Sequence, residues 1–403
     1  MAPMISVAEA ISLVKAHARP LPAETIILGD ALGRVLAEDI SADSDLPPFN
    51  RAQMDGYAVR SMDVARAPAR LRVVGESAAG RGWHKELGAG EAVRIMTGAP
   101  VPAGADSVQK VEVTNEADGL VEISEATRPG QFIVERASEI KAGETVLCAG
   151  EEINGAMTAV LASFGYARVQ VSKRPRVCVL ATGSELVGVT ERPAQDQIRD
   201  SNSYSLGAYA QLAGAEAERL PLAGDDLETL KREIAMAASR SDALILSGGV
   251  SMGVYDFTKA ALRALDAEIF FERVSLRPGK PTVFARLGQT LVFGLPGNPV
   301  SVSVTFNLFA RTALRAMQGC REAAMLEETA LLARRVKGTA ARTSYLPAKL
   351  GTDDDGRLLA EPLKWGGSSD FVAFARATAL IIVPADVSHM EAGESVSVVR
   401  LPG

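Results

Sequence analysis

The sequence is poor in the residues that build disulfide frameworks and histidine-rich metal sites. Its 403 residues include three cysteines, none in a C-x-x-C pair, and three histidines that are scattered along the chain. This pattern argues against a disulfide scaffold, a zinc finger and a histidine-built metal centre. Cys178 lies inside an apolar run at residues 177–180, so we expect a small buried residue there.

Positive charge, aromatic residues and long apolar runs are also scarce. A net charge of -6 and an aromatic content of 5% argue against a nucleic-acid binder. The chain has no run of ~18 apolar residues, so we expect no membrane span. Its N-terminus lacks the basic segment and apolar core of a secretory signal, so we expect a cytoplasmic protein. The length predicts about two to four domains.

The two ends of the chain, and the region that follows its first helix, have recognisable local patterns. Ser6 and Glu9 form a capping box, in which each side chain pairs with a backbone N–H, and this predicts a helix at the N-terminus. A mostly β domain is predicted from short runs between glycines and prolines, at residues 71–74, 92–96 and 120–123. A small C-terminal barrel or sandwich is predicted from further β-like runs at residues 380–383 and 396–399.

Between these β regions, apolar strands alternate with helices. A helix is expected at residues 153–164, with Gly165 just after its end. The strands are expected at residues 177–181, 243–247 and 290–295. The helices that follow them are expected at residues 203–213, 226–239, 255–265 and 300–318. This alternation predicts a parallel sheet covered by helices on both faces.

Three loops follow the expected strands and combine glycine with small polar side chains. Their candidate binding residues are Thr182 and Gly183; Ser247, Gly248, Gly249 and Ser251; and Pro296, Gly297 and Asn298. Ligands of parallel α/β sheets bind at the carboxyl ends of the strands, and helix N-termini there favour anions. One such turn often serves only chain reversal, but three on one sheet predict an anion or phosphate site. The chain lacks the P-loop motif and a clean G-x-G-x-x-G.

A cationic segment precedes the third loop. In an extended conformation Arg273, Ser275 and Arg277 would share one face, and two prolines would stiffen the turn that carries Lys280. Arginine binds oxyanions through a fork of donors, and lysine adds a point charge. A solvated basic edge is the alternative, but the prolines and the neighbouring loops favour an oxyanion site.

Carboxylates also lie near these loops. Glu185 ends the first loop, Asp256 follows the second, and Asp225 follows Gly224. Acidic groups beside a phosphate-binding face can hold Mg²⁺, which takes oxygen ligands. The structural alternative is that Asp225 caps a helix with Glu228 as its partner, and that Asp256 likewise caps its helix.

Seven short strings together resemble the MoeA family, whose eukaryotic counterpart is the gephyrin E-domain. They occur in the family's order and are MDGYAVR (54–60), RIMTGA (94–99), GAD (104–106), TGSEL (182–186), SGGVS (247–251), RPGKP (277–281) and LPGNPVS (295–301). The resemblance implies an N-terminal helix at 1–26, an extended linking domain at 27–46 and 146–174, a mostly β domain at 47–145, a molybdopterin-binding-like α/β domain with a parallel-type sheet at 175–326, and a C-terminal β barrel at 327–403.

The resemblance also implies an activity and an assembly. The activity is the Mg²⁺-dependent reaction of molybdate with adenylylated molybdopterin, which gives molybdenum cofactor and AMP. The assembly is a homodimer with its active-site cleft between subunits, and the family allows contact with molybdopterin adenylyltransferase and with enzymes that accept the cofactor. No nucleic acid and no membrane is expected as a partner.

Individual positions match the family's functional residues. The matching positions with an expected catalytic role are Asp55, Thr97, Glu185, Asp225 and Asp256, and Glu139 stands where the family usually has aspartate. Arg273 and Arg277 stand where lysine is common, and Ser184 replaces a frequent aspartate. Arg342 and Ser368 match positions near the molybdate.

These matches give a working hypothesis and two rivals. We expect the glycine loops to hold the phosphate and AMP groups, Arg277, Lys280 and Arg342 to hold molybdate, and Glu185, Asp225 and Asp256 to position Mg²⁺ or the attacking water. Stabilising the charge that develops at phosphorus would be the main catalytic effect. The rivals are a molybdopterin adenylyltransferase, which would require ATP, and a non-catalytic molybdopterin-binding scaffold, which would release no AMP.

Overall fold

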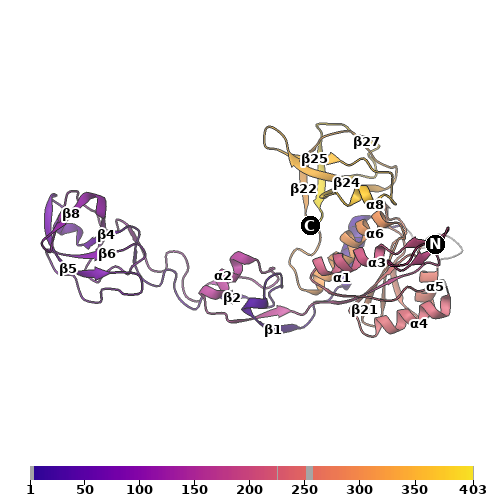
Figure 1. The fold of residues 1–403 in the computed structure, drawn as a ribbon, viewed down its shortest axis with the longest axis horizontal. Coiled ribbons are helices and arrows are strands. Elements are labelled where there is room, and N and C mark those ends of the chain that lie inside the picture. The colour runs from indigo at the N-terminus through magenta and orange to yellow at the C-terminus, as the bar shows by residue number, and fades with distance from the viewer. Residues whose placement is uncertain (1–3, 225, 251–256, 403) are drawn as a thin grey trace. The chain divides into compact units, whose positions relative to one another are not determined.

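The computed structural model describes residues 4–224, 226–250 and 257–402, and they divide into two compact units (Figure 1). The first unit comprises Met1–Glu38, Ala149–Asn154 and Arg168–Gly403, and the second comprises Asp39–Cys148 and Gly155–Ala167. None of the helices among the described residues has the length and apolar character needed to cross a bilayer.

The second unit is built around a curled, mostly antiparallel sheet. In spatial order its strands are β7 (Ser107–Lys110), β4 (Gly56–Val59), β6 (Glu91–Ile95), β5 (Ala69–Ser77), β9 (Leu120–Ile123) and β8 (Thr114–Ala117). Neighbouring residues of β4 contribute to two different apolar clusters, because successive side chains of a strand point to opposite faces. The predicted β runs at 71–74, 92–96 and 120–123 are confirmed.

Shorter elements complete the second unit. They are the strand pairs β2 (Ile40–Ser41) with β11 (Thr145–Leu147) and β3 (Arg51–Ala52) with β10 (Ile133–Val134), the 3-10 turns Ser61–Val64 and Val111–Val113, and helix α2 (Gly155–Ser163). Helix α2 confirms the helix predicted at 153–164. Gly165 follows it with φ 77°, a conformation that glycine adopts without steric cost.

The core of the first unit is a six-stranded α/β sheet in the described chain. Its order is β16 (Glu216–Arg219), β13 (Arg176–Ala181), β17 (Ala243–Ser247), β21 (Thr290–Leu295), β20 (Val283–Leu287) and β18 (Glu268–Phe271). The pairs from β16 to β21 are parallel, as predicted, whereas β20 runs antiparallel to both β21 and β18. The reversal follows from the two-residue turn at Gly288, because a parallel connection needs a long crossover.

Helices cover both faces of this sheet (Figure 1). Apolar residues of one face pack with α1 (Val7–His17), α3 (Asn202–Leu212), α6 (Pro299–Thr305) and α7 (Arg311–Met317). The other face packs with α4 (Leu227–Ala238) and α5 (Phe257–Ala264). Helix α1 has the predicted capping box, in which Ser6 N donates to Glu9 Oε2 at 2.7 Å and Glu9 N donates to Ser6 Oγ at 3.2 Å.

Two helices differ in detail from the expected ranges. The start of α4 is capped by Asp226, which accepts a hydrogen bond from Thr229 N at 2.8 Å. Asp225, the alternative cap considered from the sequence, lies outside the described residues. The helix expected at 300–318 contains a π-helical segment, Phe306–Ala310, where Asn307 Nδ2 donates to Ser303 O at 2.9 Å and so competes for a backbone acceptor.

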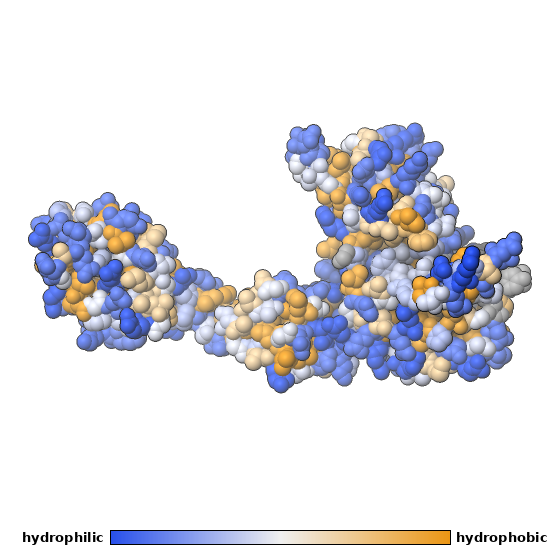
Figure 2. Space-filling view, viewed as in Figure 1, coloured by the Kyte–Doolittle hydropathy of each residue, from blue (hydrophilic) through white to orange (hydrophobic). Residues whose placement is uncertain are grey.

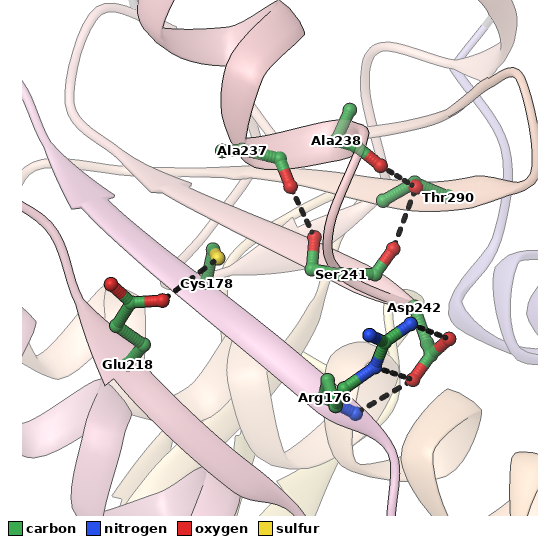
Figure 3. A network of polar contacts seen from close by, with 8 residues as sticks. All are labelled: Arg176, Cys178, Glu218, Ala237, Ala238, Ser241, Asp242 and Thr290. Atoms are coloured by element: carbon green, nitrogen blue, oxygen red, sulfur yellow. Dashed lines mark hydrogen bonds and ion pairs between the residues drawn. The ribbon is translucent and has the colours of Figure 1, made fainter.

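A polar network aligns the beginnings of the central strands (Figure 3). Asp242 accepts from Arg176 N at 2.8 Å, and Thr290 Oγ1 donates to Ser241 O at 2.8 Å, so β13, β17 and β21 start in register. Cys178 is buried beside this network, as predicted, and burial raises the pKa of its thiol. The network lies at the amino ends of the strands and leaves their carboxyl ends for the loops.

The C-terminal part of the first unit is a closed β barrel, which confirms the predicted barrel. Its strands are β24 (Thr343–Thr352), β25 (Leu358–Pro362), β22 (Glu327–Leu332), β28 (Ser395–Arg400) and β26 (Ala379–Val383), and β26 pairs with β24 to close the ring. Strand β19 (Leu276–Arg277) joins β24 at the edge. The remaining elements of this unit are β1 (Ala23–Ile27) with β12 (Arg168–Ser172), the 3-10 turn Leu28–Asp30, β14 (Leu186–Val187) with β15 (Ile198–Arg199), β23 (Val336–Lys337) with β27 (His389–Met390), and α8 (Phe371–Phe374).

Candidate functional site

The three predicted loops of the α/β sheet meet at one cavity. Its volume is about 980 Å³, and it is lined by residues from each loop. The predicted residues among its walls are Thr182, Gly183, Glu185, Ser247, Gly248, Gly249, Pro296, Gly297 and Asn298. They are brought together because β13, β17 and β21 are parallel neighbours, so their carboxyl ends share one edge of the sheet.

The second loop requires its two glycines because other backbone and side-chain atoms pack closely on it. A Cβ atom on Gly248 would lie 2.4 Å from Thr182 O, and one on Gly249 would lie 2.6 Å from Thr258 Oγ1. Both glycines have positive φ angles, 97° and 64°. Gly248 N donates to Leu295 O at 3.2 Å, so of these two glycines Gly249 is the one that can offer its backbone N–H to a phosphate oxygen in the cavity.

Asn202 links the second loop to the third and was missed by sequence reasoning. Its Nδ2 donates to Ser247 Oγ at 2.9 Å and to Gly297 O at 2.7 Å. A carbonyl only accepts, so the contact with Gly297 O fixes which end of the amide is nitrogen. Asn202 opens α3 and lines the cavity. In the sequence Asn202 looks like an ordinary residue at a helix start, so its bridge between the two loops could not be predicted.

Among the described residues, two carboxylates line the cavity in different ways. Glu185 folds over the first loop, since a Cβ on Gly183 would lie 2.4 Å from Glu185 Oε2. Asp200, which was not predicted, is 6% exposed and accepts from Ser203 N at 3.0 Å and from Ser203 Oγ, so it stabilises the start of α3. Over the described ranges no three acidic, histidine or cysteine side chains gather as a metal site. Asp225, Ser251 and Asp256 lie outside the described residues.

The predicted cations stand apart from the large cavity. Val274 and Leu276 are fully buried, so Arg273, Ser275 and Arg277 alternate with them as the extended pattern predicted. Arg277 donates to Thr339 Oγ1 and lines a smaller cavity of about 250 Å³.

Of the other two cations of the expected molybdate site, Lys280 follows Arg277 in the chain and Arg342 is linked to it through Thr339. Arg342 N donates to Thr339 O at 3.2 Å, in the turn that leads into β24. The backbone oxygen of Lys280 accepts a hydrogen bond from Val274 N at 3.0 Å. The next residue, Pro281, lines the large cavity. Arg277, Lys280 and Arg342 are not among the residues that line that cavity.

A segment from the C-terminal part of the chain forms another wall of the large cavity. Ser368 Oγ accepts from Asn298 Nδ2 at 2.9 Å, and Ser368 O accepts from Val300 N at 3.0 Å. These bonds fix the segment to the third loop. Its residues Ser369 and Phe371 line the cavity and were not predicted, because no local pattern links them to the loops.

The remaining candidates lie in the second unit. Asp55 Oδ1 accepts from Thr97 N at 2.6 Å and from Thr97 Oγ1 at 2.7 Å. These bonds, the backbone one first, lower the pKa of the Asp55 carboxyl and favour its ionised form. Glu139 Oε1 accepts from Arg51 Nη2 at 3.2 Å, in an ion pair whose two side chains are both exposed. Asp55 and Thr97 thus form one polar group, and Glu139 belongs to another.

Known proteins resemble the chain over nearly its whole length. Residues 5–165 match the MoeA N-terminal region (domain I and II), residues 178–316 a probable molybdopterin binding domain, and residues 329–401 the MoeA C-terminal region (domain IV). The molybdopterin molybdenumtransferase of Bacillus subtilis (strain 168) is 36% identical, and the match covers 98% of this chain and 94% of the relative.

Further relatives agree with this match. The molybdopterin molybdenumtransferase of Staphylococcus aureus (strain COL) is 35% identical over 98% of this chain and 95% of its own. The crystal structure of the molybdopterin biosynthesis moeA protein from Pyrococcus horikoshii OT3 superposes with a TM-score of 0.86 at 27% identity. That superposition covers 99% of this chain and 100% of the other.

Proposed function

The chain belongs to the MoeA family of molybdenum cofactor biosynthesis proteins, and from this premise we propose that it is a molybdopterin molybdenumtransferase. In the proposed reaction adenylylated molybdopterin and molybdate give molybdenum cofactor and AMP. The observation that carries the proposal is the large cavity at the carboxyl ends of β13, β17 and β21.

The cavity suits a substrate that combines phosphates with ring systems. About 980 Å³ is at the upper end of the range for small-molecule sites, which is roughly 300–1,000 Å³. The backbone N–H of Gly249, at the cavity wall, can donate a hydrogen bond to a phosphoanhydride. Asn202 holds the second and third loops at a fixed spacing for these contacts.

Glu185 fits the proposed use of Mg²⁺ because its carboxylate supplies oxygen at the cavity wall. Magnesium usually takes one or two protein carboxylates together with substrate phosphates, and it neutralises charge on those phosphates. Asp225 and Asp256 are proposed as further ligands from their matches to the family pattern. Water attack on the phosphoanhydride, helped by these acids, would release AMP.

Molybdate is proposed to bind at the cationic residues Arg277, Lys280 and Arg342. A tetrahedral dianion suits the forked donors of arginine and the point charge of lysine. Ser368 is proposed as a neighbouring contact, and Arg273 as a further cation. In the second unit, Asp55, Thr97 and Glu139 are proposed as functional side chains.

We also propose the remaining features that the family resemblance implies. They are a homodimer, a cytoplasmic location, and contact with molybdopterin adenylyltransferase and with enzymes that accept the cofactor. Light scattering of the purified chain tests the first of these directly. A monomer at micromolar concentration would contradict the homodimer.

AMP release tests the proposed function. Purified chain is mixed with adenylylated molybdopterin and Mg²⁺, with and without molybdate, and AMP is measured. We expect release that depends on molybdate and is lost when Mg²⁺ is chelated. Turnover that requires ATP would indicate an adenylyltransferase instead, and a folded chain that binds the carrier without releasing AMP would indicate a scaffold.

A further inference from the structure

One wall of the large cavity carries an aromatic ring without an aromatic partner in the described chain. Phe371 is 50% exposed although it lines the cavity. Apolar residues are scattered over the surface in Figure 2, so exposure alone does not single out one phenylalanine. Phe371 is singled out by its position at the cavity wall, because a ligand that binds there can cover its ring.

The backbone that carries Phe371 is held firmly. Phe371 is the first residue of α8, and Asp370 caps this helix by accepting from Ala373 N at 3.1 Å. The same carboxylate accepts from Gly366 N at 2.8 Å. One turn later Phe374 is only 6% exposed and belongs to the main apolar core. A capped and anchored helix presents its exposed ring at little cost in conformational entropy.

The segment that carries the ring is also hydrogen-bonded to the third glycine-containing loop, where we propose that phosphate binds. The bonds of Ser368 to Asn298 and Val300 join the segment before α8 to the third loop. Leu186 and Ile198 also line the cavity and add apolar surface to it, and Ile198 is 58% exposed. The cavity therefore combines a polar region at the loops with apolar side chains, and the apolar region includes one flat ring.

We propose that Phe371 is a specificity residue on which a planar heterocycle of the substrate stacks. This proposal rests on the proposed function, which places a carrier with two flat ring systems, a pterin and an adenine, in this cavity. Both present the same chemistry, an extended π face, which prefers offset stacking on an aromatic ring. Phe371 would thus orient the carrier while the loops hold its phosphates.

The test compares variants that change the ring with one that changes its neighbour. Phe371→Leu keeps an apolar side chain but removes the ring, Phe371→Trp keeps a ring, and Phe371→Ala removes both. Val372→Ala is the matched control, because Val372 is 67% exposed on the same helix but does not line the cavity. Circular dichroism checks that each variant is folded.

For each variant we measure the kinetics of AMP release and the calorimetric affinity for two ring-containing probes. In AMP release, Phe371→Leu and Phe371→Ala should raise KM by about 3- to 10-fold with little change in kcat. Phe371→Trp and Val372→Ala should keep the KM of the unchanged chain. Calorimetry with AMP alone and with 6-hydroxymethylpterin alone then identifies the ring, since only the probe that stacks on Phe371 loses affinity in Phe371→Leu.

The two proposals fail in different ways. Absence of AMP release by the unchanged chain would contradict the proposed function, whereas the two binding probes would still report on Phe371. Unchanged KM and unchanged affinity for both probes in Phe371→Leu would overturn the stacking role. A rise in KM of the same size in Val372→Ala would overturn it as well, because the effect would then belong to the helix surface.

Discussion

At the scale of single residues, Asp55 and Thr97 show how one short contact lowers the pKa of a carboxyl. The Asp55 carboxyl accepts two hydrogen bonds from Thr97, one from the backbone and one from the hydroxyl. Both bonds favour the ionised form and lower the pKa of Asp55. The carboxyl is ionised at neutral pH, as an ordinary aspartate is, and the contact with Thr97 extends its ionised range to lower pH.

Replacing Thr97 by valine should move this pKa upward. The hydroxyl bond is lost but the backbone bond remains, so the Asp55 pKa should rise part of the way toward about 3.9. Because folding lowers this pKa, the associated stability is present above the unfolded value and is lost as pH falls through the folded value. In Thr97→Val this linked stability should be smaller, and its loss should be complete at a higher pH. Carboxyl titration by NMR measures the shift.

The control for this prediction is Thr114→Val. The Thr114 hydroxyl donates to Val111 O at 2.9 Å and takes no part in the Asp55 contact. It should leave the titration of Asp55 unchanged. An ordinary pKa for Asp55 in the unchanged chain, or the same pKa in Thr97→Val, would show that the contact does not lower the pKa of Asp55.

At the scale of elements, the second unit depends on close contact between β4 and β7. A Cβ atom on Gly56 would lie 1.9 Å from Gln109 O, an overlap with backbone that no rotamer can relieve. Gly56→Ala should therefore destabilise this unit by at least about 2 kcal/mol, as overpacking typically does. Urea unfolding followed by circular dichroism measures the change.

Gly155→Ala is the matched control for Gly56→Ala. Gly155 begins α2 in the same unit, and a Cβ there would meet nothing within 4 Å. Alanine is the better helix former, so this variant should be neutral or slightly more stable. Equal stability of both variants would mean that β4 can move away from β7 without loss.

The local sequence pattern of each element explains whether it could be predicted from the sequence. The strands β13, β17 and β21 are short apolar runs with loops of glycine and small residues after them, so their pattern is local. The antiparallel strands β18 and β20 were missed, because their direction depends on a short turn at Gly288 and on pairing with distant residues. The π-helical segment gave no periodic signal, since it adds one residue to a continuous helix.

At the scale of the whole molecule, the candidate site depends on contacts between distant parts of the chain. Parallel strands bring their carboxyl ends to one edge, so the convergence of the three loops could be expected from the sequence. Asn202 and Phe371 could not be found in that way. Asn202 acts through an amide that bridges two loops, and Phe371 lies on a segment that the bond between Ser368 and Asn298 joins to the third loop.

The central claim is that the large cavity binds the phosphate of the adenylylated carrier at its glycine loops. A crystal structure of the chain with AMP tests it most directly. We expect the AMP phosphate within hydrogen-bonding distance of the backbone N–H groups of Gly249 and of residues 297–298. AMP bound at another place, such as the smaller cavity beside Arg277, with the glycine loops free of it, would contradict the claim.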